Sequence, residues 1–270
     1  MINMQDQQEQ QFPPEIYNLA ITSQLGVPTA EYKTRVRFKI WLSVFCLVFA
    51  TLALLLVLLT FLIKLPIPAP YTPWHILVLG LLALSYGLRL SFIVFPVRAA
   101  RVYVCPAGLL LIKGNKTHVI RWDLVASVWH KNDIYGYVYD THLFTLRLTD
   151  KQTFKFDSNW HNLAALGETI MNETAHYLFP QAMAAYNSGN PVAFGDLKLS
   201  WQGISGRKKS LAWQQIKNID IGATAVTIES IDGTGKAPWA RFRVAGMPNF
   251  LVFERMLDSV WAGQQPQQRW

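Results

Sequence analysis

Apolar residues are distributed unevenly along the chain, and the longest apolar run comes early. Residues Ile40–Ile63 contain no charged side chain. At about 1.5 Å of rise per residue, a helix of this length exceeds the hydrocarbon core of a bilayer, which is about 30 Å thick. A core helix of a soluble protein would also carry a polar stripe, which this run lacks. The pattern predicts a membrane span over residues 40–63.

A second apolar run covers residues 74–97 and contains one charge, Arg89. The intervening segment KLPIPAPYTP is rich in proline, which prevents a continuous helix and favours a short turn. We therefore expect a helical membrane hairpin over residues 40–97. Trp41 and Trp74 lie near the ends of the two runs, where aromatic side chains occupy the membrane interface.

Basic residues flank the hairpin on its two outer sides and are rare in its connecting loop. The cations before and after it outnumber the single cation between the runs (Lys33, Arg35, Arg37, Lys39, Arg98 and Arg101, against Lys64). In membrane proteins, an excess of Lys and Arg is typical of the loops on the cytoplasmic side. The bias predicts that both termini lie in the cytoplasm, with residues 1–39 as a cytoplasmic N-terminal segment and Arg98 at the interface.

Arg89 allows two interpretations. It lies close enough to the cytoplasmic end of its run for the side chain to extend to the headgroups, which is the interpretation we favour. The alternative is a buried charge with a function in the membrane. Ala83 and Gly87 on the same run are small residues four positions apart that could let helices pack closely, as in an oligomer.

After Arg98 the apolar pattern changes from helical to alternating. Short β-branched and aromatic runs are separated by turn residues, and a helical stretch over residues 162–178 follows, with Ser158 or Asn159 as the expected N-cap. The same order recurs further along the chain and ends in a predicted helix over residues 247–261. These patterns predict two α+β modules, over 98–190 and 191–262, and a disordered tail over 263–270.

The two modules also share residues at matching positions. A glycine precedes a tryptophan in each module, and apolar residues follow that tryptophan at spacings of three and six (Gly108, Trp122, Val125 and Val128; Gly203, Trp213, Ile216 and Ile219). An internal duplication explains this agreement. We expect both tryptophans to be core residues, because large aromatic side chains dominate the burial energy of small modules.

The stretches Gly-Leu…Ile-Arg-Trp-Asp-Leu-Val and Gly-Ile…Ala-Trp-Gln-Gln-Ile resemble the first hairpins of bacterial pleckstrin-homology-like domains. Together with LGVPTAEY before the hairpin, the chain resembles an uncharacterised bacterial family of membrane-anchored proteins with paired domains of this type. The resemblance implies two bent antiparallel barrels or sheets, each closed by a C-terminal helix. It implies no established activity.

Charge and cysteine content exclude several functional classes. The formal net charge of +8 is spread along the chain, so we expect no nucleic-acid partner, since binding faces for nucleic acid need clustered cations. Cys46 lies inside the first span and Cys105 just after the second, so a disulfide between them is implausible. The six histidines show no ligand-like spacing, and we interpret them as surface or interface residues. We expect no catalytic residues, metal or cofactor.

One charge cluster suggests a ligand. Arg207, Lys208 and Lys209 fall in a hairpin turn that we place between the first two strands of the second module, with Lys198 on the preceding strand. In lipid-binding pleckstrin-homology domains such a turn holds phosphates, so these residues are candidates for contact with anionic lipid headgroups. A solvated turn that aids solubility is the alternative. Lys113 and Lys116 occupy the analogous turn of the first module.

These features predict a non-enzymatic protein of a bacterial inner or plasma membrane. Its expected role is that of a membrane-anchored scaffold or sensor whose cytoplasmic modules bind a protein or anionic lipid. The alternative is a subunit of an oligomeric transport or envelope-stress assembly, in which the hairpin would associate with other copies.

Overall fold

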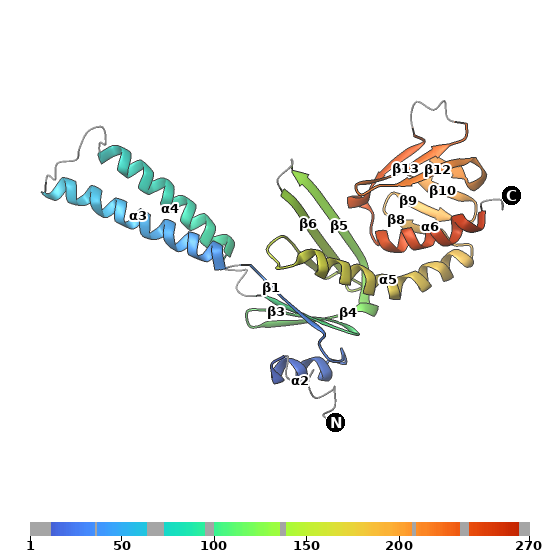
Figure 1. The fold of residues 1–270 in the computed structure, drawn as a ribbon, viewed down its shortest axis with the longest axis horizontal. Helices are drawn as coiled ribbons and strands as arrows, with labels where there is room; N and C mark the ends of the chain where they lie inside the picture. The colour runs from blue at the N-terminus through green and yellow to red at the C-terminus, as the bar shows by residue number, and fades with distance from the viewer. Residues whose placement is uncertain are drawn as a thin grey trace, which may run out of the picture. The chain divides into compact units, whose positions relative to one another are not determined.

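The structure is a computed structural model that describes residues 12–35, 37–63, 73–94, 100–135, 139–206, 209–232 and 238–264. It is an α+β protein with several antiparallel sheets (Figure 1). The chain forms two compact units, one made of residues 33–102 and 111–118 and the other of residues 1–32, 103–110 and 119–270.

Two apolar helices, α3 (Arg37–Ile63) and α4 (Pro73–Val94), pack against each other as a hairpin. Glycines on α4 allow the close approach, since a Cβ atom at Gly80 would lie 3.1 Å from the Cβ of Ala53, and one at Gly87 would lie 3.1 Å from Cγ of Leu47. The hydroxyl of Ser43 also donates a hydrogen bond to the carbonyl oxygen of Gly87 at 3.2 Å. Small side chains therefore set the helix spacing, as they do between membrane helices.

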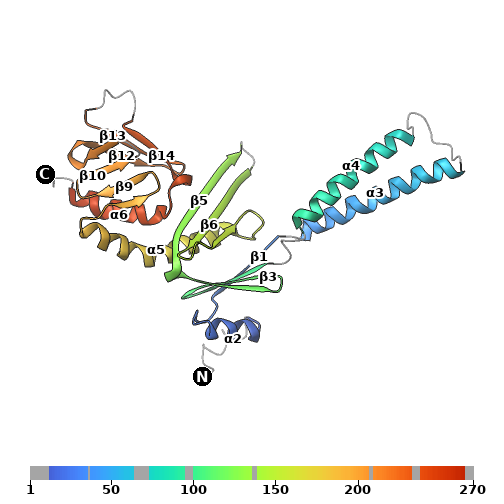
Figure 2. The same ribbon diagram turned by 180° about the vertical axis from the view of Figure 1, so that it is seen from behind.

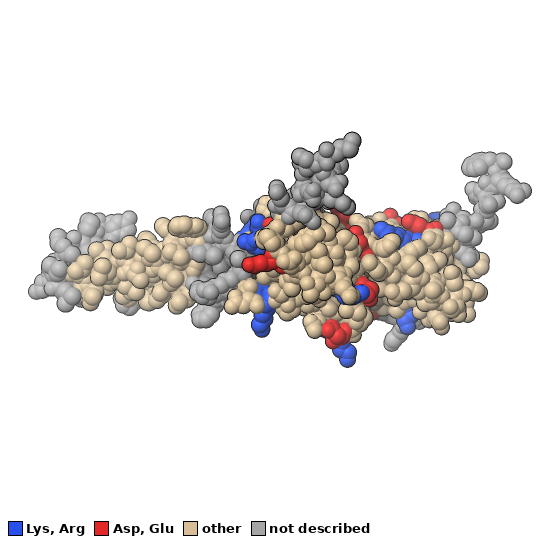
Figure 3. All heavy atoms as spheres, turned by 90° about the horizontal axis from the view of Figure 1, so that it is seen from below, with Lys and Arg blue, Asp and Glu red and all other residues tan. Residues whose placement is uncertain are grey.

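The prediction of two membrane spans is supported for the first only. Among the helices in the described ranges, one is long and apolar enough to cross a membrane, over the 19 residues Trp41–Leu59. The apolar stretch of α4 is shorter, Leu77–Arg89. On the face shown in Figure 3, the described atoms of the hairpin carry no charged side chain, whereas Lys, Arg, Asp and Glu are scattered over the rest.

Ahead of the hairpin lie helix α2 (Pro14–Thr22) and strand β1 (Ala30–Lys33). After the hairpin come β2 (Arg101–Cys105), β3 (Gly108–Lys113) and β4 (Lys116–Arg121), and the four strands form one sheet in the order β1-β2-β3-β4. The backbone N–H of Thr29 donates to the carbonyl oxygen of Val104 at 2.7 Å, and that of Thr34 to Ala100 at 3.1 Å. The hairpin is thus an insertion between two neighbouring strands.

A short 3₁₀ helix, η2 (Trp122–Leu124), leads into a three-stranded sheet in the order β5-β6-β7. Its strands are β5 (Val125–Tyr135), β6 (Tyr139–Leu148) and β7 (Thr153–Phe156), and helix α5 (Leu163–Asn187) follows. The predicted N-cap was wrong. Asn162 holds that position without a side-chain capping bond, and Asn159 instead hydrogen-bonds Asp157 because the chain turns before the helix begins.

The second module repeats this order of elements. One sheet runs β11-β10-β9-β8 and the other β12-β13-β14, with a 3₁₀ helix between them and a final helix, α6 (Figures 1 and 2). No closed barrel forms among the described residues. The bounds are β8 (Val192–Phe194), β9 (Leu197–Ser200), β10 (Gly203–Gly206), β11 (Lys209–Ala212), η3 (Trp213–Gln215), β12 (Ile216–Ile221), β13 (Ala225–Ser230), β14 (Ala240–Arg243), η4 (Val244–Gly246) and α6 (Phe250–Gln264).

The two tryptophans shared by the modules make the same contacts. Nε1 of Trp122 donates to the carbonyl oxygen of Cys105 at 3.3 Å, and Nε1 of Trp213 donates to that of Ser200 at 2.9 Å. Both side chains are buried. Each acceptor carbonyl lies three residues before the shared glycine, so the sequence correspondence extends to the hydrogen bonds.

The two shared glycines, Gly108 and Gly203, also have equivalent surroundings in the two modules. A Cβ atom at Gly108 would overlap the carbonyl oxygen of Ile120, and one at Gly203 would overlap that of Leu211. In both modules this oxygen belongs to the residue two positions before the tryptophan. The glycine lets the neighbouring strand approach closely enough for the tryptophan to reach its acceptor.

Helix α5 contributes to the cores of both modules. Near its start, Gly167 lies against the ring of Phe144 on β6 so closely that a Cβ atom would overlap the ring. Farther along, Ala175 and Tyr186 belong to the buried cluster of the second module. The helix extends beyond the predicted 162–178 and continues through Pro180. This extension packs the second module onto the helix of the first.

Candidate functional site

The cations predicted to bind lipid do not share one face. Lys198 on β9 pairs with Ser205 on β10, whereas Lys209 on β11 pairs with Gly206, the next residue of that strand. Because successive residues of a strand point to opposite faces, Lys198 and Lys209 lie on opposite faces of the sheet. Both side chains are exposed.

Arg207 and Lys208 lie outside the described residues. The segment that contains them lies between β10 and β11 in the sequence, and these are the third and fourth strands of the module because β8 and β9 precede them. Its predicted place between the first two strands was therefore wrong. The analogous turn of the first module, between Lys113 and Lys116, joins β3 to β4 and is equivalent to it.

The residues predicted for the membrane interface belong to the hairpin. The side chain of Trp41 on α3 is 74% exposed, and Arg89 on α4 is exposed. Trp74 belongs to α4, but its side chain lies outside the described part, as does Arg98 altogether.

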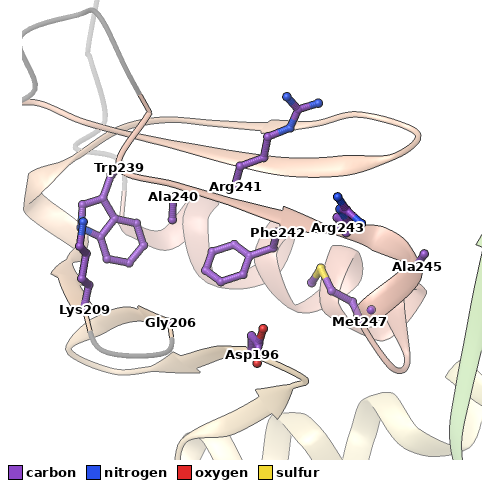
Figure 4. A pocket seen from close by; sticks show the side chains of 11 residues that line it. Asp196, Gly206, Lys209, Trp239, Ala240, Arg241, Phe242, Arg243, Ala245 and Met247 are labelled. Atoms are coloured by element: carbon purple, nitrogen blue, oxygen red, sulfur yellow. The ribbon is translucent and has the colours of Figure 1, made fainter.

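A cavity of about 870 Å³ runs along β14, the last strand of its sheet. Phe242 points from β14 into this space, and Gly206 lies across from it (Figure 4). A Cβ atom at Gly206 would overlap the Phe242 ring, so the glycine makes room for that ring. We call this cavity the β14 groove; its lining residues are Asp196, Gly206, Lys209, Trp239, Ala240, Arg241, Phe242, Arg243, Ala245, Gly246 and Met247.

Most of the charged residues that line the β14 groove are cations. Lys209, Arg241 and Arg243 contribute three positive charges, and Asp196 contributes the single acid among the lining residues. Arg241 points away from the cavity floor (Figure 4). A negatively charged ligand is therefore favoured along β14.

A second cavity of about 510 Å³ shares Arg241 and Arg243 with the β14 groove and reaches β5 of the first module. Nε2 of His130 on β5 lies 2.9 Å from Nδ1 of His142 on β6, and the ring of His130 stacks on Phe144 with centroids 4.4 Å apart. A hydrogen bond between these nitrogens requires at least one neutral ring.

Asn249 fixes the boundary between the two modules. Its side-chain oxygen accepts the N–H of Val128 at 2.8 Å, and its backbone N–H donates to the Val128 carbonyl oxygen at 2.7 Å. Its Nδ2 also donates to the carbonyl oxygen of Ala126 at 3.2 Å. Asn249 has a φ of 55°, a left-handed conformation that asparagine adopts more readily than most residues. These bonds hold the start of β5 beside the start of α6.

Burial raises the pKa of the Cys105 thiol to about 11, which keeps it protonated and unreactive at neutral pH. The described ranges contain no group of three or more His, Cys, Asp or Glu side chains that could hold a metal ion.

A family model matches residues 4–266, nearly the whole chain. The chain belongs to DUF6585, a family of unknown function. None of the curated proteins compared with the chain matches it. The expected resemblance to an uncharacterised family is therefore confirmed at the level of the DUF6585 family. Bacterial origin, the membrane hairpin and the pleckstrin-homology-like domains are not part of that match and stay predictions.

Sequence reasoning missed two features of the DUF6585 chain that shape its cavities. His130 and His142 are twelve positions apart, and the register of β5 with β6 brings them together. The arginines of β14 were missed because the run ARFRVA was interpreted only as a short strand. An arginine on each side of a phenylalanine does indicate a strand with one charged and one apolar face.

Proposed function

We propose that this DUF6585 chain is a membrane-anchored, non-enzymatic binding protein. In this proposal the hairpin over residues 40–97 crosses the inner or plasma membrane of a bacterium twice. Two pleckstrin-homology-like modules then face the cytoplasm, as do both termini. The chain serves as a scaffold or sensor whose modules bind a protein or anionic lipid.

The main support for a double crossing is the pairing of β1 with β2. These neighbouring strands flank the hairpin in the sequence, so the chain must leave and return on the same side of any membrane that it enters. This pairing supports an even number of crossings. If Trp41–Leu59 crosses, α4 must provide the return. Its 22 residues at about 1.5 Å each give about 33 Å, enough to span about 30 Å of hydrocarbon.

Exposed apolar side chains around the hairpin support its place in lipid. Phe45 is 67% exposed, Leu52 59% and Leu82 60%. Apolar patches of this extent are rare on soluble proteins unless another apolar phase covers them. Arg89 is exposed within the last turns of α4, where its long side chain can reach the headgroups.

The repeated order of elements supports the assignment of the modules. Each has a four-stranded sheet, a 3₁₀ turn beginning at a tryptophan, a three-stranded sheet and a long helix. This is the arrangement that a pleckstrin-homology-like resemblance implies, with two sheets and a closing helix. The alternative role in an oligomeric assembly has less support, since Gly87 contacts Leu47 within the hairpin.

Cysteine labelling tests the double crossing. In a Cys46→Ala/Cys105→Ala background, Thr72→Cys should react with a membrane-impermeant maleimide added to intact cells. Lys217→Cys, an exposed position in the second module, should react only after permeabilisation. Labelling of both positions from the same side would refute the two-span proposal.

A second measurement tests the lipid hypothesis. With the full chain in nanodiscs, anionic lipid should increase the hydrogen-exchange protection of residues 203–212, because cations in that turn would contact the headgroups. Arg207→Glu/Lys208→Glu should abolish the increase. The control Lys198→Glu should keep it, since Lys198 lies on the opposite sheet face from Lys209. Equal protection in neutral and anionic nanodiscs would exclude this ligand.

A further inference from the structure

Strand β14 has one edge that bonds no neighbouring strand in the described part of the chain. Val244, directly after β14, donates its backbone N–H to Thr224 at 2.9 Å. Residues of an antiparallel ladder point their N–H and C=O groups alternately toward and away from the partner strand. The backbone groups of Phe242 therefore point to β13, and those of Arg241 and Arg243 point to the open side. This open edge can pair with an added strand.

The β14 groove has the dimensions and charge to receive such a strand. Its volume of about 870 Å³ extends along all of β14 and the preceding residue, Trp239. The positive lining described above favours an acidic occupant over a neutral or basic one. Opposite charges on directly facing residues of two strands also stabilise their pairing.

Alternation along β14 sets the pattern of the occupant. Arg241 and Arg243 are exposed on one face of the strand, while Phe242 is half-buried on the other and lies against Gly206. A strand added to β14 alternates in the same way. Its residues on the arginine face would be acidic, and the residue between them would be apolar and pack beside Phe242.

We propose that the β14 groove binds an extended acidic segment of a partner protein, which adds to β14 as a further strand. The segment carries an acidic-apolar-acidic alternation matched to Arg241, Phe242 and Arg243. This inference rests on the proposed function, since it names the chemistry of the protein that the scaffold or sensor recognises. Main-chain hydrogen bonds supply part of the affinity, and the alternating side chains supply the specificity.

Fluorescence anisotropy with the full chain in mild detergent tests the charge pattern. The probe is a labelled peptide of alternating Glu and Leu, and the comparison peptide has the same composition with all Glu before all Leu. Arg241→Glu/Arg243→Glu should weaken binding of the alternating peptide more than tenfold. The control Arg147→Glu/Lys217→Glu makes the same charge change at exposed positions outside the groove and should leave binding unchanged.

N-methylation of the probe tests strand addition itself. Two versions of the alternating peptide carry methyl groups on alternate amides, so that each blocks one edge of the peptide. One version should keep its affinity and the other should lose it, because only one edge of the peptide can face β14. Equal binding of both versions, or equal binding of the comparison peptide, would show simple charge attraction and overturn the inference.

The peptide result and the membrane topology can fail separately. If cysteine labelling indicates two crossings but the alternating peptide does not bind, the proposed membrane anchor stands and this inference is overturned. Loss of binding to anionic vesicles in Arg241→Glu/Arg243→Glu, without any effect on the peptide, would assign the groove to lipid and also overturn the inference.

Discussion

Replacing Trp213 tests the claim that one tryptophan secures each module. Trp213 is 3% exposed and lies in the core of the second module. Its Nε1–H donates to Ser200 at 2.9 Å, and its ring lies 5.9 Å from that of Trp261 on α6, centroid to centroid. Trp213→Ala removes the contact between η3 and α6 together with the hydrogen bond to Ser200 on β9.

The expected cost follows from those two losses. Truncating a buried Trp to Ala costs about 3–5 kcal/mol. Trp213→Phe keeps most of the apolar contact and leaves the Ser200 carbonyl without its donor, at a cost of about 1–3 kcal/mol. Trp201→Ala, at a side chain that is 59% exposed, should cost less than about 0.5 kcal/mol.

Hydrogen exchange of the full chain in detergent measures these costs within the second module. Since each 1.4 kcal/mol is a factor of ten, protection of β9–β11 and α6 should fall by about 10²–10⁴-fold in Trp213→Ala. The phenylalanine variant should lie between Trp213→Ala and the Trp201→Ala control. Equal protection in Trp213→Ala and Trp201→Ala would refute the assignment of Trp213 as a core anchor.

Three further predictions address the glycines and one carboxyl group. Gly203→Ala should destabilise the second module by about 1–3 kcal/mol in the same exchange experiment, because its Cβ would strike the β11 backbone; unchanged protection would contradict this. Gly87→Cys should form an intramolecular disulfide with Cys46 on mild oxidation, because a Cβ atom at Gly87 would lie 3.3 Å from the Cβ of Cys46. Mass spectrometry detects the disulfide. The control Leu82→Cys, at an exposed position, should stay reduced. Burial raises the pKa of the Glu254 carboxyl, and the nearby carboxylate of Asp258 raises it further. The folded protein therefore favours the protonated carboxyl, and the stability that this group contributes is fully present below its unfolded pKa of about 4.3. That stability is lost as the pH rises through the pKa of the folded state. Glu254→Gln should therefore stabilise the protein at pH 7 by under about 1 kcal/mol and have no effect near pH 3 in thermal unfolding; a loss of stability at pH 7 would contradict this sign.

Local patterns in the sequence predicted most of the elements. The apolar run beginning at Ile40 gave the long helix α3, and the alternating runs after Arg98 gave strands at the expected places. The matching positions of Trp122 and Trp213 pointed to equivalent surroundings, which the two indole hydrogen bonds show. These features depend on short-range periodicity, which a single sequence contains.

Features that depend on distant pairing were not predictable. Strand β1 has four residues and joins its sheet only through β2, on the far side of the hairpin, so nothing local marks it. The faces of Lys198 and Lys209 depend on strand register, where a shift of one residue reverses every side chain. The continuation of α5 past Pro180 depends on packing against the second core.

The insertion of the hairpin between β1 and β2 also has a consequence for biosynthesis. Strand β1 leaves the ribosome well before its partner, because both apolar helices must be made before β2 is translated. The first sheet can therefore close only after the whole hairpin has emerged. Until then β1 has no neighbour, and the second module and the shared helix α5 do not yet exist. In the proposed topology, membrane insertion of the hairpin would precede folding of the sheets, and a chain arrested before β2 would remain without its first sheet.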